Sequence, residues 1–263
     1  AAAARAAAGE RWGRAGGSEQ AESSWETYLA FQAEPGQRCR DCWLPRPSCC
    51  CAGLPPVRLE GLRVCLVMHP REIGQHRGSN TAKLLLRWGA ELFVWGHPEH
   101  DDRLRGLVAE HLGRSAVLFP ASDAAPAEGL FRADRPSPAL VVVLDGRWKD
   151  TRRMNHGIDC RVPRCRVTVT RAEFGSTRKY RAFEKPERVE TAAAFIALVK
   201  DLGQDEAVVA AMAQGLTWHT DCYAQLITWG KESAELPAAR RADAATGPGA
   251  PVAATGRLAS TKK

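Results

Sequence analysis

Four short apolar segments constrain the fold of this chain more than any other feature of its sequence. Each is a nearly continuous apolar run of five to seven residues, the pattern of a strand buried on both faces of a sheet. The segments are 62–68, 91–95, 115–119 and 139–144, and the last reads ALVVVL. Runs this short suit strands rather than helices, so we expect four buried strands.

Helix-compatible segments separate and follow these predicted strands. They cover residues 80–89, 101–112, 189–202 and 205–229, and a shorter amphipathic piece is expected at 24–37. Strands that alternate with helices indicate an α/β domain built on a largely parallel sheet with helices on both sides. We therefore predict an α/β fold of this kind.

The 263 residues allow one domain with tails at both ends. We expect a low-complexity or disordered segment at 1–37, the domain at 38–232 and a disordered tail at 233–263. The Ala/Arg/Gly-rich stretch 1–17 fits an organelle transit peptide or an unstructured tail. Cytoplasm or nucleus is favoured over a plastid or mitochondrion. No apolar run is long enough to cross a membrane, and the sequence does not indicate an oligomeric state.

Positive charge is concentrated in one part of the chain. Residues 147–188 hold thirteen Arg or Lys and five Asp or Glu, a local excess of +8 that exceeds the net charge of +7. The rest of the chain therefore sums to about −1. A local basic excess favours a polyanionic partner, and nucleic acid is the partner that we expect.

Five of the nine cysteines lie within residues 39–51. In a domain with an ample core, such clustering indicates a metal site rather than a disulfide framework. We predict a structural zinc site whose ligands are Cys39, Cys42, Cys49 and Cys51, with Cys50 pointing away. The alternative is a reduced cysteine-rich segment without metal.

Polar residues follow the strongest predicted strand. Asp145 and Gly146 come directly after it, where ligands bind in open α/β sheets. A carboxylate there suits proton abstraction, and Gly146 allows a close approach of the backbone to a ligand. Trp148 offers a flat surface for an adenine or a flipped uracil. Alternatively, Asp145 caps the helix that follows.

Two further groups of polar residues have both functional and structural interpretations. His69 and Glu72 follow the first strand; His69 orients a substrate or shuttles a proton, or it is only a hydrogen-bonding residue of a turn. Asn80 and Thr81 cap their helix or help to receive an anionic ligand. Arginines in the basic region are phosphate contacts or a solvated charged face. These are Arg152, Arg153, Arg164 and Arg181.

The order and spacing of motifs over residues 38–203 resemble the DTW-domain tRNA-uridine aminocarboxypropyltransferases. The matching elements are, in chain order, Cys39-x-x-Cys42-x-x-Pro45-x-x-x-Cys49-x-Cys51, His69-Pro70-x-Glu72, Asn80-Thr81, Val117-Leu118-Phe119-Pro120, Asp145-Gly146-Arg147-Trp148, Arg152-Arg153-Met154, Val162-Pro163-Arg164, Tyr180-Arg181 and Glu190-Thr191-Ala192-Ala193-Ala194. Arg147 replaces the threonine of the naming motif, Glu190 a serine and Ala193 a glutamate, and Phe183 lies where an arginine is expected.

The resemblance implies a SPOUT-like fold and transfer of the 3-amino-3-carboxypropyl group of S-adenosylmethionine to N3 of a tRNA uridine, with release of methylthioadenosine. It implies that Asp145 and Trp148 are catalytic. The residues that it implies for cofactor binding are His69, Glu72, Asn80, Thr81, Gly146 and Thr191. The alternatives are a SPOUT-like RNA methyltransferase, and a non-catalytic, zinc-stabilised RNA-binding protein of the same family, which the changes at Arg147 and Ala193 favour.

Overall fold

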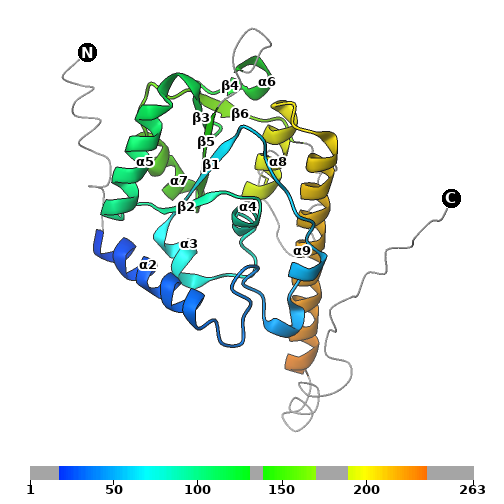
Figure 1. Ribbon diagram of the computed structural model, residues 1–263. Helices are drawn as coiled ribbons and strands as arrows, with labels where there is room; N and C mark the ends of the chain where they lie inside the picture. The colour runs from blue at the N-terminus through cyan, green and yellow to red at the C-terminus, as the bar shows by residue number, and fades with distance from the viewer. Residues whose placement is uncertain (1–17, 131–138, 170–188, 236–263) are drawn as a thin grey trace, which may run out of the picture.

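A sheet of six parallel strands forms the centre of the protein, in the order β2-β1-β5-β3-β6-β4 (Figure 1). The computed structural model describes residues 18–130, 139–169 and 189–235. The strands are β1 Arg63–Met68, β2 Glu91–Val94, β3 Ser115–Leu118, β4 Ala125–Pro126, β5 Leu140–Asp145 and β6 Arg164–Arg166.

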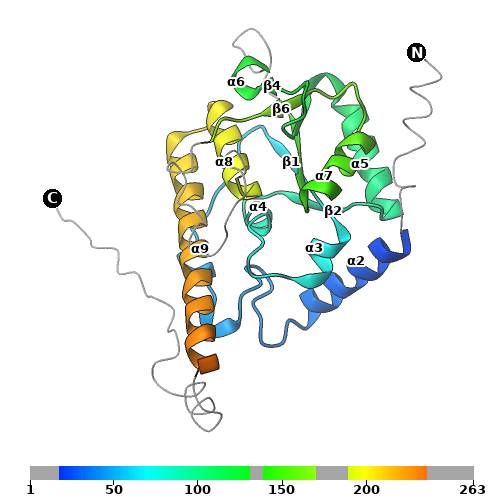
Figure 2. The same cartoon turned by 180° about the vertical axis from the view of Figure 1, so that it is seen from behind.

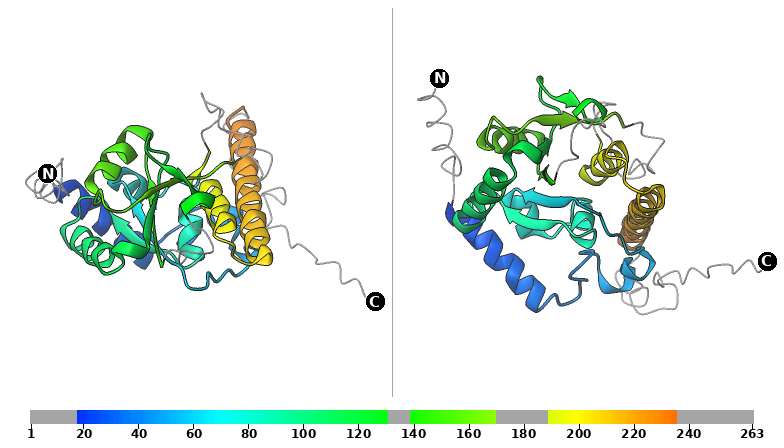
Figure 3. Two further views of the ribbon diagram at one scale, coloured as in Figure 1. Left: turned by 90° about the horizontal axis from the view of Figure 1, so that it is seen from above. Right: turned by 45° about the horizontal axis from the view of Figure 1, so that its top comes forward.

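Helices cover both faces of this sheet (Figure 3). The α-helices are α2 Ser18–Ala33, α3 Pro70–Gln75, α4 Lys83–Arg87, α5 Pro98–Glu110, α6 Ala127–Leu130, α7 Trp148–Gly157, α8 Thr191–Asp201 and α9 Glu206–Glu235. Short 3-10 helices are η1 Arg46–Ser48, η2 Cys51–Gly53 and η3 Leu112–Arg114.

The sheet divides the interior into two cores because successive side chains of a strand point to opposite faces. On β1, Leu66 packs in one core with α4, α8 and α9, whereas Val67 packs in the other with α5 and α7. Every residue of β5 is buried. A strand covered on both faces must be apolar throughout, which is why the run at 139–144 predicted it correctly.

The predicted α/β architecture, with its largely parallel sheet and flanking helices, is confirmed, and the four predicted strands are β1, β2, β3 and β5. The SPOUT-like relationship remains a prediction. Strands β4 and β6 were not predicted, because β4 has only two residues and β6 is a single cysteine between two arginines, so neither carries an apolar run. Helix α5 begins at Pro98, earlier than predicted, because proline at the first turn suits a helix start.

The N-terminal segment differs from the prediction of disorder before Ser24 and of a short piece at 24–37. Helix α2 begins at Ser18 and packs against α3. Its Trp25 ring lies edge-on to His100 at a centroid distance of 4.5 Å, and Phe31 stacks on His76 at 4.1 Å. Aromatic contacts of this kind stabilise the helix against the domain, so propensity alone was a poor guide to its start.

Helix α9 is the longest and lies along the side of the molecule opposite to α2 and α5 (Figure 2). Its inner residues Met212 and Leu216 pack into the core that α8 also lines. Among the described residues, no helix is both long enough and apolar enough to cross a membrane.

The chain leaves β1 and β5 in opposite directions across the sheet. After β1 it passes through α3 and α4 to β2 on one side, and after β5 it passes through α7 to β6 on the other. The two strands are neighbours, and Met68 pairs in register with Asp145 at their carboxyl ends. Diverging connections open the edge at which α/β proteins bind ligands.

Gly157, at the end of α7, provides a test of this packing. A Cβ added there would lie 2.1 Å from Cη2 of Trp95, a distance at which something must move. We expect Gly157→Ala to lower the free energy of unfolding by about 1–3 kcal/mol, measured by chemical denaturation. Gly106, inside α5, has open space around an added Cβ. Gly106→Ala should raise the stability by about 0.5–1 kcal/mol, and equal effects would contradict the account.

Candidate active site and metal centre

The carboxylate of Asp145 joins three elements at the carboxyl edge of the sheet. Its Oδ2 accepts a hydrogen bond from Nδ2 of Asn80 at 2.7 Å, and its Oδ1 accepts one from Oγ1 of Thr191 at 2.7 Å. The residue is only 7% exposed. Helix α7 begins at Trp148 with Arg147 as its N-cap residue, so Asp145 does not occupy the N-cap position.

Asn80 reaches Asp145 because the turn before α4 holds it in place. Its Oδ1 accepts from the backbone N–H of Lys83 at 3.3 Å, while its Nδ2 also donates to Oε2 of Glu72 at 3.3 Å. Asn80 therefore closes the turn before α4 and hydrogen-bonds two carboxylates of the protein, while its role in binding an anionic ligand stays a prediction. Thr81 is buried beside it.

His69 and Gly146 lie against each other where β1 and β5 end. The backbone N–H of His69 donates to the carbonyl of Asp145 at 2.9 Å, and a Cβ at Gly146 would lie 3.1 Å from Cβ of His69. Nδ1 of His69 caps α3 by accepting from the N–H of Arg71 at 3.3 Å. Burial lowers the pKa of His69, so the ring is neutral near pH 7 and its proton is on Nε2.

Trp148, in the first turn of α7, is one of the two large hydrophobic side chains exposed among the described residues. Its ring stacks on Phe119 at a centroid distance of 5.5 Å, with the guanidinium carbon of Arg152 5.5 Å from its centroid. Phe119 follows β3, so this stack joins the loops after β3 and β5. A rigid, partly exposed indole is suited to stacking against a nucleobase.

Arg147, the residue that departs from the naming motif, has changed the start of α7. It is the N-cap residue, but its side chain makes no capping hydrogen bond. Instead its Nε donates to Oδ2 of Asp150 at 3.0 Å. Asp150 is nine-tenths buried, and its Oδ1 lies 4.0 Å from Nε2 of His69. A threonine at this position would cap the helix directly, with Asp150 placed as in a capping box.

The prediction that Arg164 contacts RNA is wrong. Its guanidinium donates five hydrogen bonds, to Oδ1 of Asn155 and to the carbonyls of Asn155, Ile158, Asp159 and Val162. Because arginine has five N–H donors, none is left for a phosphate. Arg164 therefore fastens the end of α7 to β6. Arg152 and Arg153 are exposed, as a phosphate contact requires, and Arg181 lies outside the described residues.

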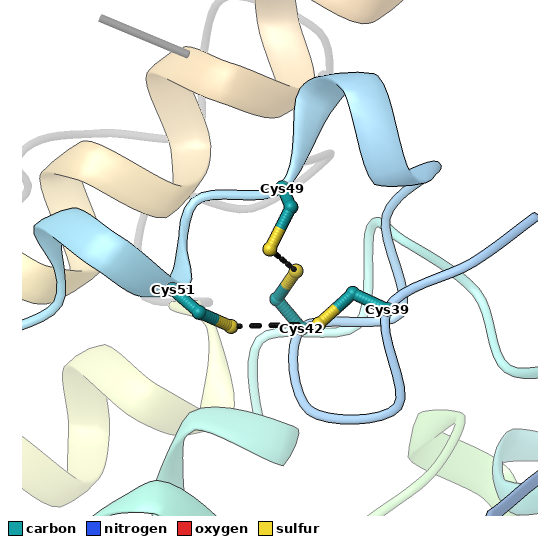
Figure 4. Close-up of side chains that lie close together, drawn as sticks. All are labelled: Cys39, Cys42, Cys49 and Cys51. Carbon is teal, nitrogen blue, oxygen red and sulfur yellow. Dashed lines mark hydrogen bonds between the residues drawn. The ribbon is translucent and has the colours of Figure 1, made fainter. Parts of the chain in front are cut away.

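The predicted metal ligands come together in the loop around η1 and η2 (Figure 4). The Sγ atoms of Cys39, Cys42, Cys49 and Cys51 all lie within 4.8 Å of one another. Two pairs are separated by 3.6 and 3.7 Å, too far for disulfides. A zinc ion with four bonds of about 2.3 Å requires sulfurs about 3.8 Å apart, so the four cysteines can hold a metal ion of this kind.

The electrostatics of the cluster also favour a cation. Hydrogen bonds from Cys50 and then Cys51 lower the pKa of Cys42, whereas burial raises the pKa of Cys49 to about 11. Four thiolates cannot be placed so close together without a positive charge among them. Cys50 is buried nearby but is not one of the four, and its carbonyl accepts from Nε1 of Trp218 at 3.0 Å.

Two residues near this cluster were not identified from the sequence. Lys83 is fully buried, and burial lowers its pKa to about 7. His219, on α9, is also fully buried, and burial lowers its pKa to about 3. Lys83 precedes three leucines in α4. The one sequence signal for its burial is its place on the apolar side of this short helix.

Comparison with known families identifies the family of this chain. Residues 36–225 match the DTW domain. None of the solved structures matches this chain. The match covers well over half of the chain, and it includes both the cysteine cluster and the residues around Asp145. The chain therefore belongs to the DTW-domain family, which is linked to tRNA modification.

The fold thus brings most of the predicted site residues together. Asp145, Asn80, Thr191 and Glu72 are connected by hydrogen bonds, and His69 and Gly146 adjoin them. Ala193, the replacement for the family glutamate, is 4% exposed and packs in the core. Asp150 was missed, although its position three residues after an N-cap residue could have indicated it.

The pairing of Arg147 with Asp150 yields a test of the motif change. Arg147→Thr restores a side-chain cap at α7, so we expect the free energy of unfolding to rise by about 0.5–1 kcal/mol. Thermal and chemical denaturation measure this. Arg147→Ala, which supplies no cap, is the control and should not stabilise the protein. Equal stability of the Thr and Ala variants would contradict the assignment of Arg147 as the uncapped N-cap.

Proposed function

We propose that this protein is a tRNA-uridine aminocarboxypropyltransferase. It would move the 3-amino-3-carboxypropyl group of S-adenosylmethionine to N3 of a uridine. The observation that carries the proposal is the buried carboxylate of Asp145, held by Asn80 and Thr191 at the carboxyl edge of a DTW domain. An exposed indole at Trp148 lies three residues after it in the sequence.

The polar groups around Asp145 suit the amino-acid part of S-adenosylmethionine. The proposed cofactor contacts are His69, Glu72, Asn80, Thr81, Gly146 and Thr191. Carboxylates at Glu72 and Asp145 suit an ammonium group, and the neutral His69 offers an N–H donor at Nε2. A side chain at position 146 would crowd His69, because an added Cβ would lie 3.1 Å from Cβ of His69. Glycine therefore leaves this space at the edge for a ligand.

The proposed reaction is a displacement at carbon. N3 of the uridine attacks the methylene carbon bonded to the sulfonium, the carbon–sulfur bond breaks, and methylthioadenosine leaves. The proton of N3 passes to the Asp145 carboxylate. Two hydrogen bonds fix the orientation of that carboxylate, and a base held in position can act with little reorganisation. Which carbon of the sulfonium reacts depends on how the cofactor is held.

Exposed groups beside the site fit tRNA. Four basic side chains are exposed on α7 and at its N-cap, and they are Arg147, Lys149, Arg152 and Arg153. They suit phosphate contacts, and Trp148, stacked on Phe119, suits a displaced uracil. Zinc bound by the four cysteines would be structural, because four sulfur ligands leave no coordination position for a substrate.

Incubation with unmodified tRNA and S-adenosylmethionine, followed by nucleoside mass spectrometry, tests the proposal. We expect a uridine heavier by one aminocarboxypropyl group, together with methylthioadenosine. A methyl-sized gain with S-adenosylhomocysteine would instead indicate a methyltransferase. Tight tRNA binding without modification would indicate the non-catalytic RNA-binding alternative, which the replacements at Arg147 and Ala193 favour.

Asp145→Asn provides a direct test of the proposed base. The amide keeps an oxygen acceptor and nearly the same volume but cannot take the N3 proton. We expect the transfer rate to fall by about 100-fold or more. The variant should still fold, with a lowered thermal unfolding midpoint, because an amide replaces a carboxylate that accepts two buried hydrogen bonds. Asp102→Asn is a control, because Asp102 is exposed on α5 and pairs with Arg105. A rate within a few-fold of the unchanged protein would remove Asp145 from the mechanism.

A further inference from the structure

Lys83 is a buried cation whose environment the proposed reaction does not explain. Its side chain is fully buried, and Nζ donates to the carbonyls of Gly78 at 2.7 Å and Arg77 at 3.3 Å. Nζ also lies 5.4 Å from the ring centroid of Trp43, next to Cys42 in the sequence. Among the ion pairs formed by the described residues, none includes Lys83.

Burial of an ammonium group is costly unless an opposite charge compensates it. The acidic groups whose charge acts on Lys83 are thiols of the cluster, those of Cys42, Cys50 and Cys51. His219 also lies within electrostatic range of Lys83, but both of its buried ring nitrogens lack a hydrogen-bond partner, and it offers no negative charge. Of the groups whose charge acts on Lys83, which also include the like-charged Arg38, only these thiols can supply a compensating negative charge.

A zinc ion bound by four thiolates has the required charge. Four thiolates and one Zn²⁺ sum to −2, so a tetrathiolate site is itself a buried anion that a nearby cation stabilises. The four sulfurs have the spacing for such a site. Lys83 is thus a buried cation placed beside a predicted buried anion, and each reduces the cost of burying the other.

Lys83 also connects the cluster to the turn that holds Asn80. Its Nζ binds two carbonyls of that turn, and its backbone N–H donates to Oδ1 of Asn80 at 3.3 Å. Nδ2 of Asn80 in turn donates to Asp145. A change in the charge balance at the cluster would therefore be transmitted to the groups that orient Asp145.

We propose that Lys83 is the counter-charge of a zinc tetrathiolate at Cys39, Cys42, Cys49 and Cys51, and that it is a positioning residue linking this site to Asn80. The inference concerns the metal site alone. It requires neither tRNA nor S-adenosylmethionine, so its failure is distinguishable from failure of the transferase proposal.

Zinc binding by Lys83→Met in the full chain tests the proposal. Methionine fills a similar volume without charge, so we expect affinity for zinc, measured by competition with a coloured chelator, to fall by about tenfold or more. With zinc removed, the same variant should be at least as stable to heat as the unchanged protein, because an uncompensated buried charge has gone. The stabilisation that zinc adds should therefore shrink in the variant.

Two further variants separate charge from structure. Lys83→Gln keeps an N–H donor for the carbonyls but is neutral, so it should lose zinc affinity as Lys83→Met does. Arg40→Met removes a cation from the loop between Cys39 and Cys42, but Arg40 is exposed to solvent. Its effect on affinity should stay below about threefold. Hydrogen exchange of amides 77–81 in the zinc-bound protein should be faster in both Lys83 variants.

Any one of the following results would overturn the inference. The first is that Lys83→Met binds zinc as tightly as the unchanged protein. The second is that Lys83→Met loses equal stability with and without zinc, or that Lys83→Gln keeps full affinity, because either would leave Lys83 only a hydrogen-bonding role. The third is a purified chain that binds no zinc or cobalt, because Lys83 would then have no tetrathiolate to compensate.

Discussion

The geometry of this protein depends on the hydrogen bonds that the buried carboxylate of Asp145 accepts. This carboxylate receives one hydrogen bond from a residue 65 positions earlier in the chain and another from a residue 46 positions later. A buried carboxylate without hydrogen-bond donors costs free energy of folding. The hydrogen bonds from Asn80 and Thr191 avoid this cost, and they hold the turn before α4 and the start of α8 against the end of β5. The same contacts that stabilise the fold thereby orient the acidic group at the carboxyl edge of the sheet.

Two departures from the family motif, at Arg147 and Ala193, leave the hydrogen bonds of Asp145 intact. Arg147 makes no side-chain cap for α7 and instead hydrogen-bonds Asp150. Both residues follow Gly146 in the sequence, whereas Asp145 precedes it. Ala193 lies in the core below the start of α8, whereas Thr191, two residues before it, keeps its hydrogen bond to Asp145. These two changes therefore affect the surroundings of Asp145 rather than its hydrogen-bond partners.

Local patterns predicted the features that depend on local physics. The buried strands were predictable because a strand covered on both faces must be apolar, and the four ligand cysteines because their spacing suits one ion. Features decided by distant contacts were not predictable. Helix α2 depends on aromatic contacts with His76 and His100, and Arg164 is occupied by carbonyls that only the fold brings to it. The sequence placed Lys83 in a helix but did not indicate that its side chain is fully buried.

Hydrogen exchange with and without S-adenosylmethionine tests most directly whether the carboxyl edge around Asp145 is the cofactor site. Binding at this edge should slow the exchange of backbone amides at 69–81, 145–148 and 190–194, segments that surround Asp145 but are far apart in sequence. Amides of α5, on the other face of the sheet, should exchange at an unchanged rate. Protection confined to other segments under saturating cofactor would contradict the account, because the cofactor would then be held away from Asp145.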